Sequence, residues 1–280
     1  MRTSIFFLFL ILFSLLSCER IIYDVDNPIN GLPTKVLMHR GCGDNTDFVA
    51  NTISAAEYGL SIMDGIELDI QMSKDGTLWL DHDNEVHDCQ GNVIGCFQEL
   101  TDQQITDAAE CDGVVRYHTL ESVFQLMSAK YPDSYISLDI KGQYCQILST
   151  PSVMRQMAES VKELVSKYKM EYKVLVESNS VAFLNIMAEQ NVVGQCVVSL
   201  GDIDKGIADA RATNARGISH KYEADPLDEG DISLIHSKGY GIIVWVINEP
   251  EDIVSVWKTN PDFIQTDNSD FKKYIPVEPY

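Results

Sequence analysis

The sequence is poor in positive charge, because its 280 residues include 21 Lys and Arg against 42 Asp and Glu, a formal net charge of −21. A chain this acidic is a poor candidate for holding nucleic acid or anionic lipid through a basic face. It has no Gly-x-Gly-x-x-Gly or P-loop pattern, which disfavours nucleotide-binding folds. It also has no Cys-x-x-Cys pair, so a structural zinc site is not expected. These absences argue against nucleic acid, and a chain this acidic suits a divalent cation or is simply soluble and self-repelling.

The longest apolar run is too short to span a membrane, and it lies near the N-terminus. It follows the basic Arg2 and ends just before Cys18. A basic start with a short apolar core is typical of a secretory signal peptide. Its end resembles a bacterial lipobox, which implies that residues 1–17 are removed and Cys18 is lipidated. Residues 18–34 are polar and suit a tether. We therefore expect a lipoprotein of the bacterial cell envelope, periplasmic or on the cell surface, held at the membrane only by its lipid.

Six of the seven cysteines remain once Cys18 is set aside. In an exported protein disulfides persist. Cys89 and Cys96 are near enough in sequence to close a short disulfide loop. Cys145 and Cys196 are expected to be buried free thiols.

From residue 35 to residue 280, strand and helix signals alternate without a long linker. This alternation predicts one α/β domain with a parallel sheet. Nine strand-like runs and the chain length fit a TIM (β/α)8 barrel better than an open sheet, with one run outside the barrel. Residues 84–119 lack periodicity and indicate a short insertion after the third strand.

Charged residues alternate with apolar ones on two of the expected strands. Glu67 and Asp69 lie two positions apart and so share one face of a strand, and Asp139 and Lys141 repeat the arrangement. Buried charges are costly unless they bind something. Because barrel active sites lie at the carboxyl ends of the strands, we expect these side chains to meet there.

The residue types at these strand ends suggest phosphodiester cleavage. The three carboxylates are hard oxygen ligands that suit Ca²⁺ or Mg²⁺. His39 and His82 each follow a strand and can transfer protons near neutral pH. Arg40 and Lys141 are suited to phosphate.

Nine short motifs follow one another between residues 39 and 267. They are His39-Arg40-Gly41, Asn51-Thr52, Glu67-Leu68-Asp69, Lys74-Asp75-Gly76, His82-Asp83, Thr119-Leu120-Glu121, Leu138-Asp139-Ile140-Lys141, Val244-Trp245-Val246-Ile247-Asn248 and Thr266-Asp267. In this order they resemble the motifs of the glycerophosphodiester phosphodiesterases, which belong to the phospholipase-C-like phosphodiesterase barrels. The resemblance covers about residues 35 to 272.

This resemblance implies metal-dependent hydrolysis of a glycerophosphodiester to sn-glycerol 3-phosphate and an alcohol. It also implies roles for eight residues. These are acid–base catalysis for His39 and His82, metal binding for Glu67, Asp69 and Asp139, phosphate contact for Arg40 and Lys141, and pocket lining for Trp245.

Two positions depart from the family pattern. Ala50 stands where the family usually has a glutamate, and Asp139 replaces a glutamate ligand with a side chain one methylene shorter. Asp139 followed by Lys141 also resembles spider-type sphingomyelinase D. Two alternatives therefore stay open. One is a phospholipase-D-like lyase or hydrolase acting on lipid head groups, and the other is a lipoprotein that only binds a phosphorylated ligand.

Overall fold

The structure is a computed structural model that describes residues 33–111, 113–141, 145, 150–190, 194–201 and 203–275. Residues 1–17, Cys18 and nearly all of the tether lie outside the described residues. No helix within the described ranges is long and apolar enough to cross a membrane.

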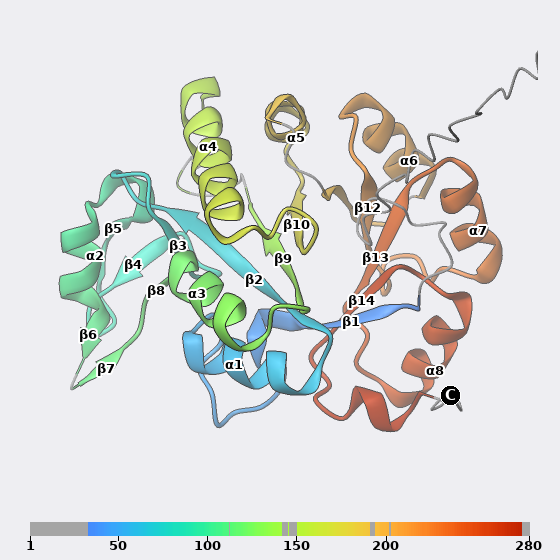
Figure 1. Ribbon diagram of the computed structural model, residues 1–280, viewed down its shortest axis with the longest axis horizontal. Coiled ribbons are helices and arrows are strands. Elements are labelled where there is room, and N and C mark those ends of the chain that lie inside the picture. Colours follow the sequence, from blue (N-terminus) through green and yellow to red (C-terminus); the bar gives the residue numbers. More distant parts are fainter. Residues whose placement is uncertain are drawn as a thin grey trace, which may run out of the picture.

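Eight parallel strands close into a barrel (Figure 1). They are β1 (Lys35–Met38), β2 (Gly65–Met72), β9 (Tyr135–Asp139), β10 (Val174–Ser178), β11 (Gln195–Ser199), β12 (Gly217–Lys221), β13 (Gly241–Trp245) and β14 (Phe263–Thr266). Each pairs with the next in this order, and β1 pairs with both β14 and β2, which closes the barrel. The predicted TIM barrel is confirmed.

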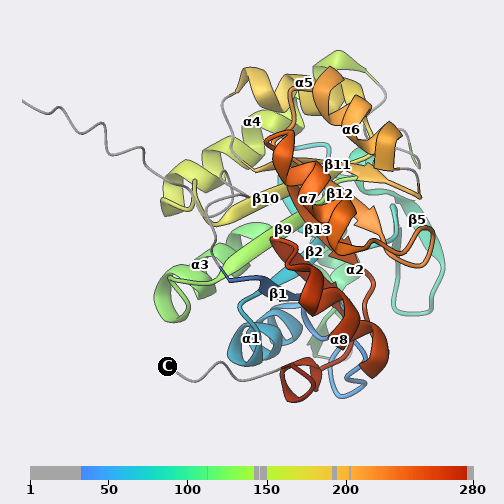
Figure 2. The same ribbon diagram turned by 90° about the vertical axis from the view of Figure 1, so that its right-hand side faces the viewer.

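Helices connect successive barrel strands and form the outer layer, and Figure 2 views the barrel from the side covered by α6, α7 and α8. They are α1 (Ile53–Ile62), α3 (Leu120–Lys130), α4 (Pro151–Tyr168), α5 (Val181–Glu189), α6 (Ile203–Ala212), α7 (Glu229–Ser237) and α8 (Pro250–Thr259). Five of them begin after a side chain that accepts a backbone N–H of the first turn, which satisfies donors that the helix leaves unpaired. The capping residues are Thr52, Thr119, Thr150, Ser180 and Asp228.

Side chains point alternately to the two faces of each strand. They form an apolar layer outside the barrel, an apolar cluster at its base and a polar lining beyond that cluster. Outward residues such as Ile66, Leu68 and Ile70 are fully buried against the helices in the main core. Inward residues near the strand starts form a second cluster that closes the base of the barrel, made of Leu37, Tyr135, Leu175, Cys196, Ile243 and Phe263. Inward positions further along the strands, toward the carboxyl end of the barrel, are mostly polar.

The ninth strand-like run is β3 (Leu78–Leu80), which pairs antiparallel with β2 outside the barrel. The predicted insertion follows this third strand and projects to one side of the barrel (Figure 1). It contains β4 (Glu85–His87), β5 (Val93–Cys96), a 3₁₀ turn (Phe97–Glu99), α2 (Asp102–Ala109), β6 (Glu110–Cys111) and β7 (Val114–Val115), and it returns through β8 (His118–Thr119). A small core of its own, centred on Trp79, Phe97 and Tyr117, stabilises it.

Cys89 does not pair with Cys96, although their spacing allows a bond, and the expected free thiol at Cys145 is wrong. Cys89 is bonded to Cys111, and Cys96 is bonded to Cys145. In the β4–β5 hairpin Cys89 lies at the turn while Cys96 pairs with Glu85 at the far end, which holds the two cysteines apart. Cys196 is buried and forms no disulfide, as expected.

Breaking the bond between Cys96 and Cys145 is expected to destabilise the protein. The bond closes a loop with a sequence separation of 49 and joins the insertion to the segment after β9. Loss of such a cross-link frees the unfolded chain, so the double change Cys96→Ser and Cys145→Ser should lower the free energy of unfolding by roughly 2–5 kcal/mol. Chemical denaturation monitored by circular dichroism measures this, and an unchanged midpoint would contradict the assigned pairing.

Candidate active site

A pocket of about 420 Å³ opens at the carboxyl end of the barrel. Seven of the eight residues with expected roles line it, namely His39, Arg40, Glu67, His82, Asp139, Lys141 and Trp245. The eighth, Asp69, is buried and contacts Arg40 and Lys141. The structure therefore brings all eight together at one place.

The three carboxylates meet because they lie in register on neighbouring strands. Asp69 on β2 is level with Asp139 on β9, and Glu67 precedes Asp69 by two positions on the same face. One oxygen of each lies within 4.8 Å of the others. Burial and the neighbouring negative charges raise the pKa of Glu67 to about 8 and that of Asp139 to about 7. Hard oxygen donors crowded together in a buried site fit a divalent cation, which would relieve this repulsion.

Two cationic side chains border the carboxylates. The Lys141 Nζ lies 2.6 Å from Asp69 Oδ1 and 3.1 Å from Asp139 Oδ2. The Arg40 Nε lies 3.3 Å from Asp69 Oδ2. Burial alone would raise the pKa of Asp69, but the charge and hydrogen bond of Lys141 and the charge of Arg40 outweigh it and lower that pKa. Both cations remain about one-third exposed to the pocket, where an anionic substrate can reach them.

The His39-Arg40-Gly41 motif forms a tight 3₁₀ turn directly after β1. A Cβ on Gly41, whose φ is +80°, would lie 2.9 Å from the α1 backbone at Ala55 and Ala56, so only glycine fits. The turn lets the Arg40 N–H donate to Glu67 Oε2 over 2.9 Å. This motif therefore holds a carboxylate as well as presenting a histidine and an arginine.

Asn51 orients Asp69 from the loop before α1. Its Nδ2 donates to Asp69 Oδ2 over 2.9 Å, and its Oδ1 accepts the Asp69 N–H over 3.0 Å. The neighbouring Ala50 is exposed to solvent. The Asn-Thr motif thus places a carboxylate and, through Thr52, begins the α1 helix.

His39 is held by a carboxylate to which sequence reasoning gave no role. Its Nδ1 lies 2.6 Å from Asp267 Oδ1, and its Nε2 lies 3.7 Å from Glu67 Oε2. Asn248 Nδ2 donates to the other oxygen of Asp267 over 2.9 Å. Burial lowers the pKa of His39, but the hydrogen bond to Asp267 and the charges of Glu67 and Asp267 outweigh it and raise that pKa. The motifs that contain Asp267 and Asn248 were the sequence features that could have pointed to this contact.

His82 reaches the pocket from β3 and not from a barrel strand. Because β3 runs antiparallel to β2, the chain returns toward Asp69, where the Asp81 N–H donates to the Asp69 carbonyl over 3.2 Å. His82 is exposed, and its Nδ1 lies 3.0 Å from Asp83 Oδ1. The two histidines therefore face the pocket from separate elements, one of them half-buried and one open to solvent.

A buried glutamate on the pocket floor was also missed. Glu177 on β10 is level with Asp139 and accepts hydrogen bonds from Ser137, Ser219 and Gln265. These three donors come from three other barrel strands, so one carboxylate ties them together inside the barrel. Burial raises the pKa of Glu177. No motif marked it, because its partners are distant in sequence.

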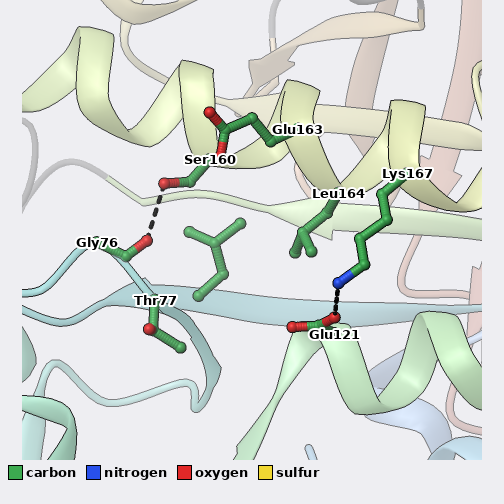
Figure 3. A pocket seen from close by; sticks show the side chains of 8 residues that line it. Gly76, Thr77, Glu121, Ser160, Glu163, Leu164 and Lys167 are labelled. Atoms are coloured by element: carbon green, nitrogen blue, oxygen red, sulfur yellow. Dashed lines mark hydrogen bonds and ion pairs between the residues drawn. The ribbon is translucent and has the colours of Figure 1, made fainter.

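A second hollow, of about 250 Å³, lies outside the barrel between the turn before β3 and helices α3 and α4 (Figure 3). Ser160 Oγ donates to the Gly76 carbonyl over 2.8 Å on one side, and Lys167 pairs with Glu121 on the other. It contains none of the residues with expected catalytic, metal or phosphate roles. All eight residues with expected roles lie instead at the carboxyl end of the barrel.

Asp267→Asn is expected to slow turnover by roughly 10²-fold, because an amide no longer fixes His39 as the carboxylate does. Asp267 would act as a positioning residue, so the loss should fall on kcat more than on KM. Steady-state kinetics with a thermal-melting control measures the effect. Equal losses in kcat and in folded protein would assign Asp267 to stability alone.

Known proteins resemble this chain in sequence and in fold. Residues 39–271 match the model of the glycerophosphoryl diester phosphodiesterase family. A glycerophosphodiester phosphodiesterase from Bacillus altitudinis is 27% identical over 247 residues, which cover 85% of this chain and 96% of that protein.

Solved structures of the same description share the barrel. The Thermotoga maritima glycerophosphodiester phosphodiesterase superposes with a TM-score of 0.65 at 22% identity, over 86% of this chain and 98% of that one. An Oleispira antarctica phosphodiesterase, solved in complex with its product sn-glycerol-3-phosphate, superposes with a TM-score of 0.68 at 15% identity, over 87% and 96%. With the family model covering most of the chain, this protein belongs to the glycerophosphoryl diester phosphodiesterase family and is a phosphodiesterase.

Proposed function

We propose that the protein hydrolyses glycerophosphodiesters to sn-glycerol 3-phosphate and an alcohol, using a divalent metal and two histidines. The observation that carries this proposal is the convergence of three carboxylates, two histidines and two cations around one pocket. The Oleispira structure, which holds sn-glycerol-3-phosphate on the same fold, supports the choice of product.

Glu67, Asp69 and Asp139 would hold the metal, either Ca²⁺ or Mg²⁺, because all three offer oxygen ligands. When bound, the metal neutralises charge on the phosphate and polarises it. Arg40 and Lys141 would bind the remaining phosphate oxygens, Arg40 as a planar fork and Lys141 as a point charge. Asp139 is one methylene shorter than the glutamate usual in the family, yet one of its oxygens lies within 4.8 Å of those of Glu67 and Asp69, so it could still hold the metal with them.

His39 and His82 would move the two protons of the reaction. One takes a proton from the attacking oxygen, and the other gives a proton to the leaving alcohol. Asp267 holds Nδ1 of His39, which leaves Nε2 on the pocket side near Glu67. The nucleophile is water, or the glycerol hydroxyl if a cyclic phosphate forms first.

Product analysis tests this proposal. Incubation of sn-glycero-3-phosphocholine with residues 19–280 and either metal should release choline and sn-glycerol 3-phosphate. The phosphorus-containing product is identified by ³¹P NMR. A cyclic phosphate that persists as the end product would identify a lyase. Binding of the substrate without turnover would identify a binding protein.

We also propose that residues 1–17 are a signal peptide and that Cys18 carries the lipid anchor. The lipobox-like sequence supports this, and so do the two disulfides, which persist in oxidising compartments. Cys18→Ala should move the full-length protein from the detergent phase to the aqueous phase in a phase-partition assay. Unchanged partitioning would contradict lipidation at Cys18.

A further inference from the structure

Apolar side chains interrupt the polar lining of the pocket, and the most exposed of them follows β11. On β11 the side chains that face the pocket are Val198 and, just after the strand, Leu200. The pocket-facing side chains of the two neighbouring strands and their ends are polar or charged, namely Glu177, Asn179, Ser219 and Lys221. Leu200 is 68% exposed. Fold stability therefore does not explain a leucine at this place, because its side chain is hardly buried.

Two further apolar residues extend this surface across the pocket wall. Trp245, at the end of β13, and Val246 line the same cavity. On the intervening strand β12, the Lys221 ammonium lies over the Trp245 ring, with its Nζ 6.0 Å from the ring centre. We call Val198, Leu200, Trp245 and Val246 the apolar strip.

The apolar strip shares a cavity with the phosphate-binding cations. Arg40 and Lys141 line this pocket together with the strip. A diester whose phosphate contacts these cations would lay one of its substituents toward the strip. Glycerol and small polar alcohols offer little apolar surface, whereas an alkyl chain would cover the exposed Leu200 and gain free energy from its burial. A cavity of about 420 Å³ is large enough for a ligand of that size.

We infer that the apolar strip binds an alkyl chain carried by the diester substrate, an inference that rests on the proposed function. The reaction is unchanged: water adds to phosphorus, the bond from phosphorus to the leaving oxygen breaks, and that oxygen leaves with a proton. If the chain is on the glycerol, the products are a monoacylglycerol phosphate and the alcohol. If the chain is on the other ester, the products are glycerol phosphate and an alkyl alcohol.

Three substrates and two variants test this inference. The substrates are sn-glycero-3-phosphocholine, its 1-decanoyl derivative below its micelle concentration, and sn-glycero-3-phosphohexanol. The variants are Leu200→Ser, and Leu234→Ser as a matched control on α7, where Leu234 is 38% exposed and lies outside the pocket. Because Leu200 is mostly exposed, its replacement should leave folding intact.

At least one chain-bearing substrate should have a kcat/KM about tenfold or more above that of glycerophosphocholine. Leu200→Ser should lower that value about tenfold and leave kcat/KM for glycerophosphocholine within about twofold of normal. Leu234→Ser should change neither value. The chain-bearing substrate with the higher kcat/KM shows which of the two esters carries the chain. Turnover of glycerophosphocholine without any gain from a chain, or a gain insensitive to Leu200→Ser, would overturn the inference alone. Turnover of none of the three would overturn the proposed function and this inference with it.

Discussion

Replacing His39 with alanine is expected to lower kcat by roughly 10²–10⁴-fold, the range that general acid–base catalysis contributes. His39 is half-buried between Asp267 and Glu67, and its Nε2 lies on the pocket side, so in the proposed mechanism alanine removes the group that transfers the proton there. The measurement is the rate of sn-glycerol 3-phosphate release at saturating substrate.

His87→Ala is the matched control for this change. His87 lies in the insertion, and the contacts shown for it involve its backbone and Tyr117. It does not line the pocket, so its loss should leave kcat within about twofold. A His39→Ala enzyme with more than about one-tenth of normal activity would remove His39 from the proposed mechanism.

Glu67→Gln should weaken metal binding by roughly 10–100-fold or more and abolish most activity at low metal concentration. The amide keeps the size of the side chain and leaves one oxygen for the Arg40 N–H, but it loses the negative charge that attracts a cation. Calorimetric titration with Ca²⁺ and with Mg²⁺ measures affinity without relying on turnover.

The control for Glu67→Gln is Glu223→Gln, which removes a carboxylate at the same pocket but outside the group of three. Glu223 is largely exposed and pairs with Lys221 over 3.4 Å. The Glu223→Gln change should leave metal affinity unchanged. Equal loss of affinity in both variants would show that overall negative charge, and not the group of three, attracts the ion.

The barrel could be predicted from local patterns, because the sequence of each strand by itself shows which side chains face inward and which face outward. Alternation of Glu67 and Asp69 with Leu68 and Ile70 defines an inward and an outward face, and the structure places both faces as expected. Seven predicted site residues line one pocket, and the eighth contacts two of them. Residues placed at strand ends meet by symmetry of the barrel, so no long-range information was needed.

Contacts created by closure of the barrel could not be predicted in this way. His39 and Asp267 are 228 positions apart and meet only because β1 pairs with β14. Glu177 likewise gains its partners from across the barrel. The disulfide pairing could not be predicted for a related reason, since the spacing of Cys89 and Cys96 allows a bond that the hairpin prevents by holding them apart.

The most direct test of the account is the release of sn-glycerol 3-phosphate from sn-glycero-3-phosphocholine by residues 19–280, with chelator and after addition of Ca²⁺ or Mg²⁺. The account predicts no release in chelator, restored release with at least one of the two metals, and almost none from His39→Ala under the same conditions. Full activity in chelator would contradict the metal site at Glu67, Asp69 and Asp139. No turnover under any of these conditions would contradict the proposed reaction.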